Sequence, residues 1–250
     1  MSEAPGTVRW VTGSGEAPVD VLLAEPSARP TVAVILYPDG FGIHDHIEHA
    51  ARRLADAGAL VAVPDVFHRL GRRVRFTLDT LDDAMVAIAG VSEADVERAT
   101  SVAVGVLTAA AGGVPAMIGI GFCFGGRIAL VARGVRPSAL RGCIALYPNG
   151  MLQKPAAWTR PPIGWATQGS SPVLLLFGGA DRLIPNDEAE AVVAALEASG
   201  AQVDSAIYAD AGHAFLWEEH PNHDPRAADD AWERITRFLR DLSEPAGHGA

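Results

Sequence analysis

The segment Gly121-Phe122-Cys123-Phe124-Gly125 constrains this chain most. The apolar residues before it are typical of the end of a buried strand, and residues 126–132 after it are typical of the start of a helix. A residue held in strained backbone geometry leaves no room for neighbouring Cβ atoms, which explains glycines on both sides of it. The segment therefore predicts a sharp strand-to-helix turn that lifts the Cys123 side chain above the end of a strand. The alternative is a buried structural cysteine in a tight turn.

Segments rich in Val, Ile and Leu alternate with amphipathic helical stretches along the whole chain. This alternation indicates βαβ units and an α/β fold with a mostly parallel sheet and helices on both faces. The predicted strands are 19–24, 31–37, 60–64, 116–120, 140–147, 172–177 and 202–208, with residues 7–10 joining the first in an antiparallel hairpin around Gly13-Ser14-Gly15. The predicted helices are 46–57, 79–89, 92–111, 127–133, 186–199 and 224–242, and residues 153–172 are predicted to be a loop.

The composition suits a globular protein with a large core, since 49% of the 250 residues are hydrophobic and 20% are charged. We expect a single domain over residues 1–250, with its core at about 15–242 and a disordered tail at 244–250. The net charge of −10 argues against a nucleic-acid partner, which would need a basic patch.

The location is expected to be cytoplasmic, with no membrane partner. No apolar run is long enough to span a bilayer, and the N-terminus lacks the pattern of a signal peptide. The two cysteines lie in separate predicted elements and do not form a disulfide framework. A monomer and a small homo-oligomer are both open.

A cysteine that projects from such a turn can act as a nucleophile when a base and an acid that orients the base accompany it. The turn fits the G-x-nucleophile-x-G motif of the α/β-hydrolase fold, in which the acid and then the base follow the nucleophile along the chain. Asp181 lies in a glycine-rich turn after one predicted strand, and His213 lies just after the next. The order predicts a triad of Cys123, Asp181 and His213; the nearby Asp187 fits better as a charge at a helix N-terminus.

An acyl-transfer site also needs N–H donors for the oxyanion. The backbone N–H of Phe124, directly after the nucleophile, is the first candidate. The second is expected from the loop after the strand at 31–37, where Gly40 can donate and Pro38 cannot. Tyr147, at the end of a predicted strand, is expected near the elbow, as a pocket residue or as plain packing.

The chain resembles the dienelactone hydrolase family over about residues 15–242. The resemblance is carried by Gly121–Gly126, by Asp39-Gly40-Phe41-Gly42, by Val63-Pro64-Asp65, by the Asp181 loop and by Gly212-His213-Ala214-Phe215. It implies a single α/β-hydrolase domain, no cofactor, the same triad, and hydrolysis of small esters or lactones. It also places Phe41 in the substrate pocket.

The resemblance assigns two further positions. Asp39 stands where the family carries an acidic residue, commonly Glu, that holds the resting thiol; a plain turn aspartate is the alternative. Trp217 stands four residues after His213, where the best-known members carry an arginine that binds a substrate carboxylate. An indole cannot make that bidentate contact, so a neutral ester or lactone is expected. The family's second arginine would lie among Arg69, Arg72, Arg73 and Arg75.

Three alternatives stay open at this stage. The same site could cleave a thioester or a C–C bond, or the chain could be a non-catalytic binding protein. Halide displacement is disfavoured because it normally uses a carboxylate nucleophile. His220 and His223 are metal-ligand residue types, but Pro221 breaks any helix between them, so a polar lid or interface loop is expected and no metal site. His44 is a candidate for the pocket mouth, and Asp45 for a helix cap.

Overall fold

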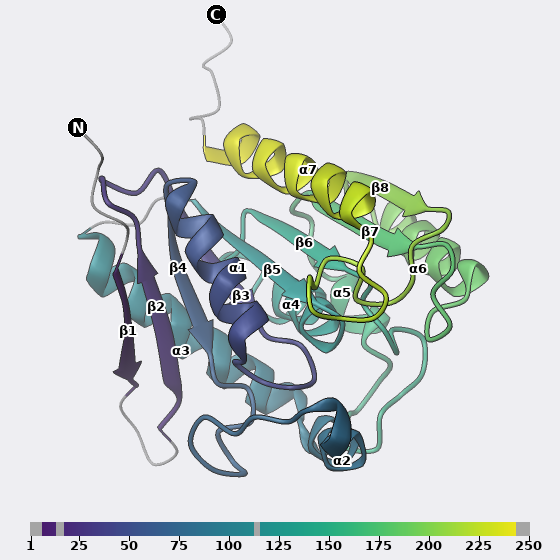
Figure 1. Ribbon diagram of the computed structural model, residues 1–250, viewed down its shortest axis with the longest axis horizontal. Coiled ribbons are helices and arrows are strands. Elements are labelled where there is room, and N and C mark those ends of the chain that lie inside the picture. The colour runs from purple at the N-terminus through teal and green to yellow at the C-terminus, as the bar shows by residue number, and fades with distance from the viewer. Residues whose placement is uncertain (1–6, 14–17, 113–115, 244–250) are drawn as a thin grey trace, which may run out of the picture.

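The computed structural model describes residues 7–13, 18–112 and 116–243. One eight-stranded sheet in the order β1-β2-β4-β3-β5-β6-β7-β8 organises them (Figure 1). The strands are β1 (Thr7–Thr12), β2 (Asp20–Glu25), β3 (Val32–Tyr37), β4 (Ala59–Pro64), β5 (Met117–Phe122), β6 (Gly142–Leu146), β7 (Val173–Gly178) and β8 (Val203–Tyr208).

The six strands β4, β3, β5, β6, β7 and β8 are parallel to one another. β2 is antiparallel to both of its neighbours, β1 and β4. The central strands β3, β5, β6 and β7 are buried along their whole length, as their continuous apolar sequences require. The predicted mostly parallel sheet and its edge hairpin are thus confirmed. Ser14 and Gly15 of the predicted turn lie outside the described residues, as does the tail at 244–250.

Helices cover both faces of the sheet. In Figure 1, α1 and α7 lie on the near face, while α3, α4 and α6 lie behind. The helices are α1 (Asp45–Asp56), α2 (Leu81–Gly90), α3 (Glu93–Ala111), α4 (Phe124–Val135), α5 (Ile163–Ala166), α6 (Asn186–Ala198) and α7 (Pro225–Ser243), with a 3₁₀ turn η1 (Leu78–Thr80) before α2. In the described part of the chain, no helix is both long and apolar enough to cross a membrane.

Several sequence predictions need correction. The stretch predicted as one helix at 79–89 is divided into η1 and α2, and the predicted loop at 153–172 contains the short helix α5. Asp45 is not the cap of α1: the N-cap is His44, without a side-chain cap bond, and Asp45 pairs with Arg75 instead. Asp187 lies in the first turn of α6, as expected.

Candidate active site

Cys123 occupies a strained turn between β5 and α4, with φ 54° and ψ −115°. Its flanking glycines are required by packing. A Cβ on Gly121 would collide with the carbonyl of Gly125, and a Cβ on Gly125 would collide with the carbonyl of Tyr37. Cys123 is partly exposed at the N-terminus of α4, where the helix dipole favours negative charge.

Asp181 and His213 are joined by a hydrogen bond although 32 positions separate them in the chain. His213 Nδ1 lies 2.7 Å from Asp181 Oδ2. The other carboxylate oxygen, Oδ1, accepts the backbone N–H groups of Leu183 at 2.7 Å and Ile184 at 3.2 Å. The turn after β7 therefore fixes the carboxylate, which in turn orients the imidazole.

The second ring nitrogen of His213 faces the nucleophile's side of the site. Nε2 is buried and has no well-aligned hydrogen bond within the described residues. Burial lowers the pKa of His213, but interactions with Cys123 and with the Asp181 carboxylate raise it more, to about 10. The surroundings therefore favour an imidazolium between these two groups.

A cavity of about 760 Å³ brings most of the predicted site residues together, within the size range of small-molecule sites. Cys123, His213, Asp39, Gly40, Phe41, Tyr147 and Trp217 all line it. Asp181 lies behind His213 and does not line the cavity. The cavity is therefore built from loops at the carboxyl ends of the strands, the edge where the triad was expected.

The two candidate oxyanion donors lie on different elements. Phe124 is the first residue of α4, so its N–H has no partner within the helix. Gly40 follows β3 and lines the cavity, and a Cβ there would approach Ile88 Cδ1 to 2.6 Å. A side chain at position 40 would therefore displace the α2 side of the pocket.

Asp39 is held by its own loop. Its carboxylate accepts the Phe41 N–H at 2.9 Å and contacts His44 Nε2 at 2.9 Å. Within the described residues no hydrogen bond joins Asp39 to Cys123. His44 was only a candidate for the pocket mouth; it does not line the cavity and contacts Asp39 instead.

Trp217 belongs to an aromatic cluster on one wall of the cavity. Its ring centroid lies 4.7 Å from that of His44, 5.3 Å from His220 and 5.9 Å from Phe41. His46 stacks on it at 5.7 Å, and burial lowers the pKa of His46 to about 4. The wall is therefore aromatic where Trp217 enters it.

Tyr147 lies against the triad. It has φ 39°, an unusual conformation for an aromatic residue, and its buried ring packs edge-on to His213 at 5.0 Å. Burial first, and then the acidic groups Asp39, Cys123 and Asp181, raise the pKa of its hydroxyl.

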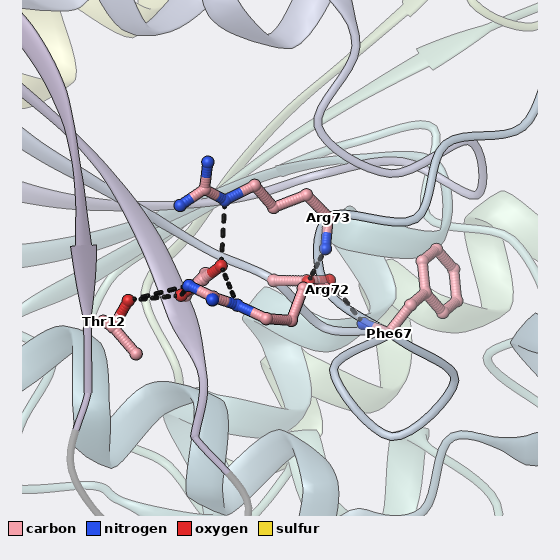
Figure 2. Close-up of polar contacts among 6 residues, drawn as sticks. Thr12, Phe67, Arg72 and Arg73 are labelled. Atoms are coloured by element: carbon pink, nitrogen blue, oxygen red, sulfur yellow. Dashed lines mark hydrogen bonds and ion pairs between the residues drawn. The ribbon is translucent and has the colours of Figure 1, made fainter.

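Two of the four candidate arginines are committed elsewhere. Arg72 and Arg73 both bind Asp20, at 2.8 Å each, and Arg72 also donates to Thr12. Figure 2 shows these side chains converging. A second carboxylate, that of Asp65 directly after β4, accepts the backbone N–H groups of Arg73 and Phe67. The segment is therefore anchored to β2 and to the end of β4.

The other two candidates are also paired outside the cavity, Arg69 with Asp95 and Arg75 with Glu48. None of the four lines the cavity. The arginine that does line it is Arg182, exposed and directly after Asp181. Arg182 was not among the residues predicted from the sequence, although its position directly after Asp181 was a signal for it.

Arg127 was also overlooked. It lies one helical turn after Cys123, is buried, and stacks over the Phe124 ring at 4.8 Å. Burial lowers its pKa to about 10, while the nearby Cys123 opposes that shift. Arg127 therefore places a buried positive charge one helical turn from Cys123.

His220 and His223 make protein contacts. His220 Nδ1 accepts the Asn222 N–H at 3.1 Å, and His223 Nδ1 lies 3.0 Å from the Phe215 carbonyl oxygen. Among the residues that the structure describes, no group of three or more His, Cys, Asp or Glu could hold a metal ion.

Known proteins share both the sequence and this architecture. Residues 19–243 match the dienelactone hydrolase family. A carboxymethylenebutenolidase of Rhodococcus opacus is 31% identical over 236 residues, covering 90% of this chain and 87% of that protein. A protein of Escherichia coli O157:H7, provisionally named a carboxymethylenebutenolidase, is 33% identical over 217 residues, covering 86% and 78%.

Solved structures agree. A Klebsiella pneumoniae protein provisionally named a dienelactone hydrolase superposes with a TM-score of 0.80 at 29% identity, covering 94% of this chain and 99% of that one. A dienelactone hydrolase-like promiscuous phosphotriesterase from metagenomic libraries shares the fold, with a TM-score of 0.79 at 24% identity over 96% and 99% of the two chains.

The sheet, the helix layers and the turn at Cys123 define an α/β-hydrolase. Within that class, the chain belongs to the dienelactone hydrolase family, whose enzymes hydrolyse lactone and ester bonds.

Proposed function

We propose that this protein hydrolyses neutral esters or lactones through a Cys123–His213–Asp181 triad and an acyl-thioester intermediate, as a single-domain cytoplasmic enzyme. The observation that carries the proposal is the 2.7 Å contact between His213 and Asp181 in a site that also presents Cys123 on a strained turn. The similarity to a carboxymethylenebutenolidase and to dienelactone hydrolases supports the bond type.

The reaction begins with the Cys123 thiolate beside protonated His213. The thiolate attacks the acyl carbon, and the oxyanion is held by the N–H groups of Phe124 and Gly40. His213 then donates its proton to the leaving alkoxide, and the alcohol departs. A water molecule loses a proton to His213 and attacks the thioester. The second tetrahedral intermediate expels the thiolate, and the acid product leaves.

Asp39 contributes through its charge and its loop. Its carboxylate fixes the Phe41 N–H and His44, which supports a role in shaping the turn that carries Gly40. We also assign it an electrostatic effect on the thiolate, because it lines the same cavity as Cys123.

The test is the hydrolysis of p-nitrophenyl acetate by purified variants. Cys123→Ala and His213→Ala should each lower kcat by roughly 10³-fold or more, and Asp181→Asn should lower it strongly with the fold intact. The kcat of the double variant His213→Ala/Asp181→Asn should be little lower than that of the worse of these two single variants, because the triad residues act as a unit. Asp187→Asn, an exposed acid beyond the same turn, is the matched control.

Mass spectrometry of quenched reactions should find the acyl group on the peptide that contains Cys123. Acylation of another residue, or near-wild-type turnover by Asp181→Asn, would contradict the mechanism. Ester binding without turnover would identify a binding protein instead.

A further inference from the structure

The segment formed by η1 and α2 presents large apolar side chains to solvent. Leu78, Leu81 and Met85 are 51%, 46% and 53% exposed. They are spaced three and four residues apart, so they share one face of this segment. Leu183, from the turn after β7, is 60% exposed and lines the same cavity.

Folding does not account for this face. The buried residues of α2 are the small residues Ala84 and Ala87, and the partly buried Ile88 also packs against the core. α2 also lies at the lower edge of the molecule in Figure 1, apart from both helix layers. Polar residues on its outer face would serve folding equally well, so the apolar residues there indicate contact with something else.

These exposed side chains border the catalytic cavity. Leu78, Leu81 and Met85 line it together with Cys123 and His213. Phe41 and Trp217 line it as well, from other loops. Apolar groups from three separate regions of the chain thus line the cavity that contains Cys123.

We propose that the η1–α2 face is the binding subsite for the apolar part of the substrate, so that the enzyme acts on neutral esters with a medium-length alkyl or aromatic group. The proposal rests on the proposed function. Its physical basis is that burying each methylene against this wall lowers the free energy of the bound substrate and of the transition state alike.

The experiment measures kcat/KM for p-nitrophenyl acetate, butanoate, hexanoate and octanoate, and for ethyl to octyl acetates. In one of the two series kcat/KM should rise about two- to fourfold per added methylene until the wall is covered. Leu81→Gln and Met85→Gln keep helix propensity and remove apolar contact. Each should lower the ratio of kcat/KM for p-nitrophenyl octanoate to that for the acetate by about fivefold. If the alkyl acetates are the series that responds, the same loss is expected in the ratio for octyl to ethyl acetate.

Val86→Gln is the matched control. Val86 is the neighbour of Met85 on the same helix and is 74% exposed, but it does not line the catalytic cavity. Its ratio should equal that of the wild type. No rise in either series, or equal losses in Val86→Gln and Met85→Gln, would overturn the proposal.

Binding of the same esters to Cys123→Ala, measured by calorimetry, separates the two proposals. Tighter binding of octanoate than of acetate, reduced by Met85→Gln, supports the subsite even if the wild type hydrolyses neither ester. Sedimentation tests whether a second copy of the chain covers this face instead. A dimer that dissociates in Met85→Gln, while the ratio of kcat/KM for long and short esters stays unchanged, would assign the face to that second copy and overturn the proposal.

Discussion

Cys123 and Cys143 differ in the properties that decide thiol reactivity. Cys123 is partly exposed at a helix N-terminus, beside His213. Cys143 is fully buried in β6, and burial raises its pKa to about 12. A thiolate is the reactive form, so the two environments should separate the cysteines chemically.

Iodoacetamide should therefore label Cys123 in the native protein and leave Cys143 unmodified until the chain unfolds. Peptide mass mapping after timed labelling checks this, with a urea-denatured sample as the control. Asp39→Asn should shift the labelling profile of Cys123 to lower pH, because a negative charge near the thiolate is lost. Labelling of Cys143 first, with activity retained, would contradict the assignment of the nucleophile.

At the scale of elements, the loop between β4 and η1 is held by the buried carboxylates of Asp20 and Asp65, and Asp20 is the one that binds arginine side chains. The Asp20 side chain is 1% exposed and binds Arg72 and Arg73. The hydrogen bond from Arg72, opposed by burial and helped by Thr12 and Arg73, lowers the pKa of Asp20 from 3.8 to about 2. These contacts of Asp20 tie the segment that leads into η1 and α2 to strand β2.

Asp20→Asn should lower the free energy of unfolding by about 1–2 kcal/mol at pH 7. The effect is smaller than for a fully buried ion pair, because water screens the partly exposed side chains of both arginines. Because the folded pKa lies below the unfolded value, the stabilisation is present above about pH 4 and is lost as pH falls through about 2. The difference from wild type should therefore shrink between pH 4 and pH 2.

Urea unfolding across this pH range measures that difference. Glu25→Gln, which removes the partner of Arg9 in a more exposed pair on the same hairpin, is the control and should change stability by less than about 1 kcal/mol. An Asp20→Asn difference that stayed constant down to pH 2 would contradict the assignment to this carboxylate.

For the whole molecule, charge acts against anionic substrates. The net charge is −10, and Trp217 stands at the position where the family resemblance leads us to expect a carboxylate-binding arginine. Among the arginines that the structure describes, Arg182 alone lines the cavity, and it is exposed. Long-range repulsion and the missing bidentate contact both favour neutral esters.

The ratio of kcat/KM for a neutral ester to that for an anionic ester of equal size should therefore exceed one. It should fall as salt rises from 0.01 M to 0.15 M, because salt screens the repulsion. Trp217→Arg should move the ratio toward the anion by about tenfold or more. A wild-type preference for the anion of tenfold would contradict this, and Arg182→Ala would then test the remaining cation.

Local sequence was sufficient for the features that depend on adjacent residues. The turn at Cys123 could be predicted because its flanking glycines are a steric requirement of the turn itself. The strands could be predicted to within a few residues because strands buried on both faces need continuous apolar runs. Asp181 and His213 could be predicted because chain order in this fold places each after a known strand.

Tertiary structure decided the contacts between segments far apart in the chain. The basic run at 69–75 could not be assigned from sequence, because its arginines are equivalent until acids from β2, α1 and α3 pair with them. Asp39 is likewise held by His44. Which side of α2 is exposed was also decided by tertiary packing, because helical spacing does not say which side meets the sheet. Sequence by itself therefore determined the fold and named the candidate triad residues, and only long-range packing determined which side chains surround the cavity.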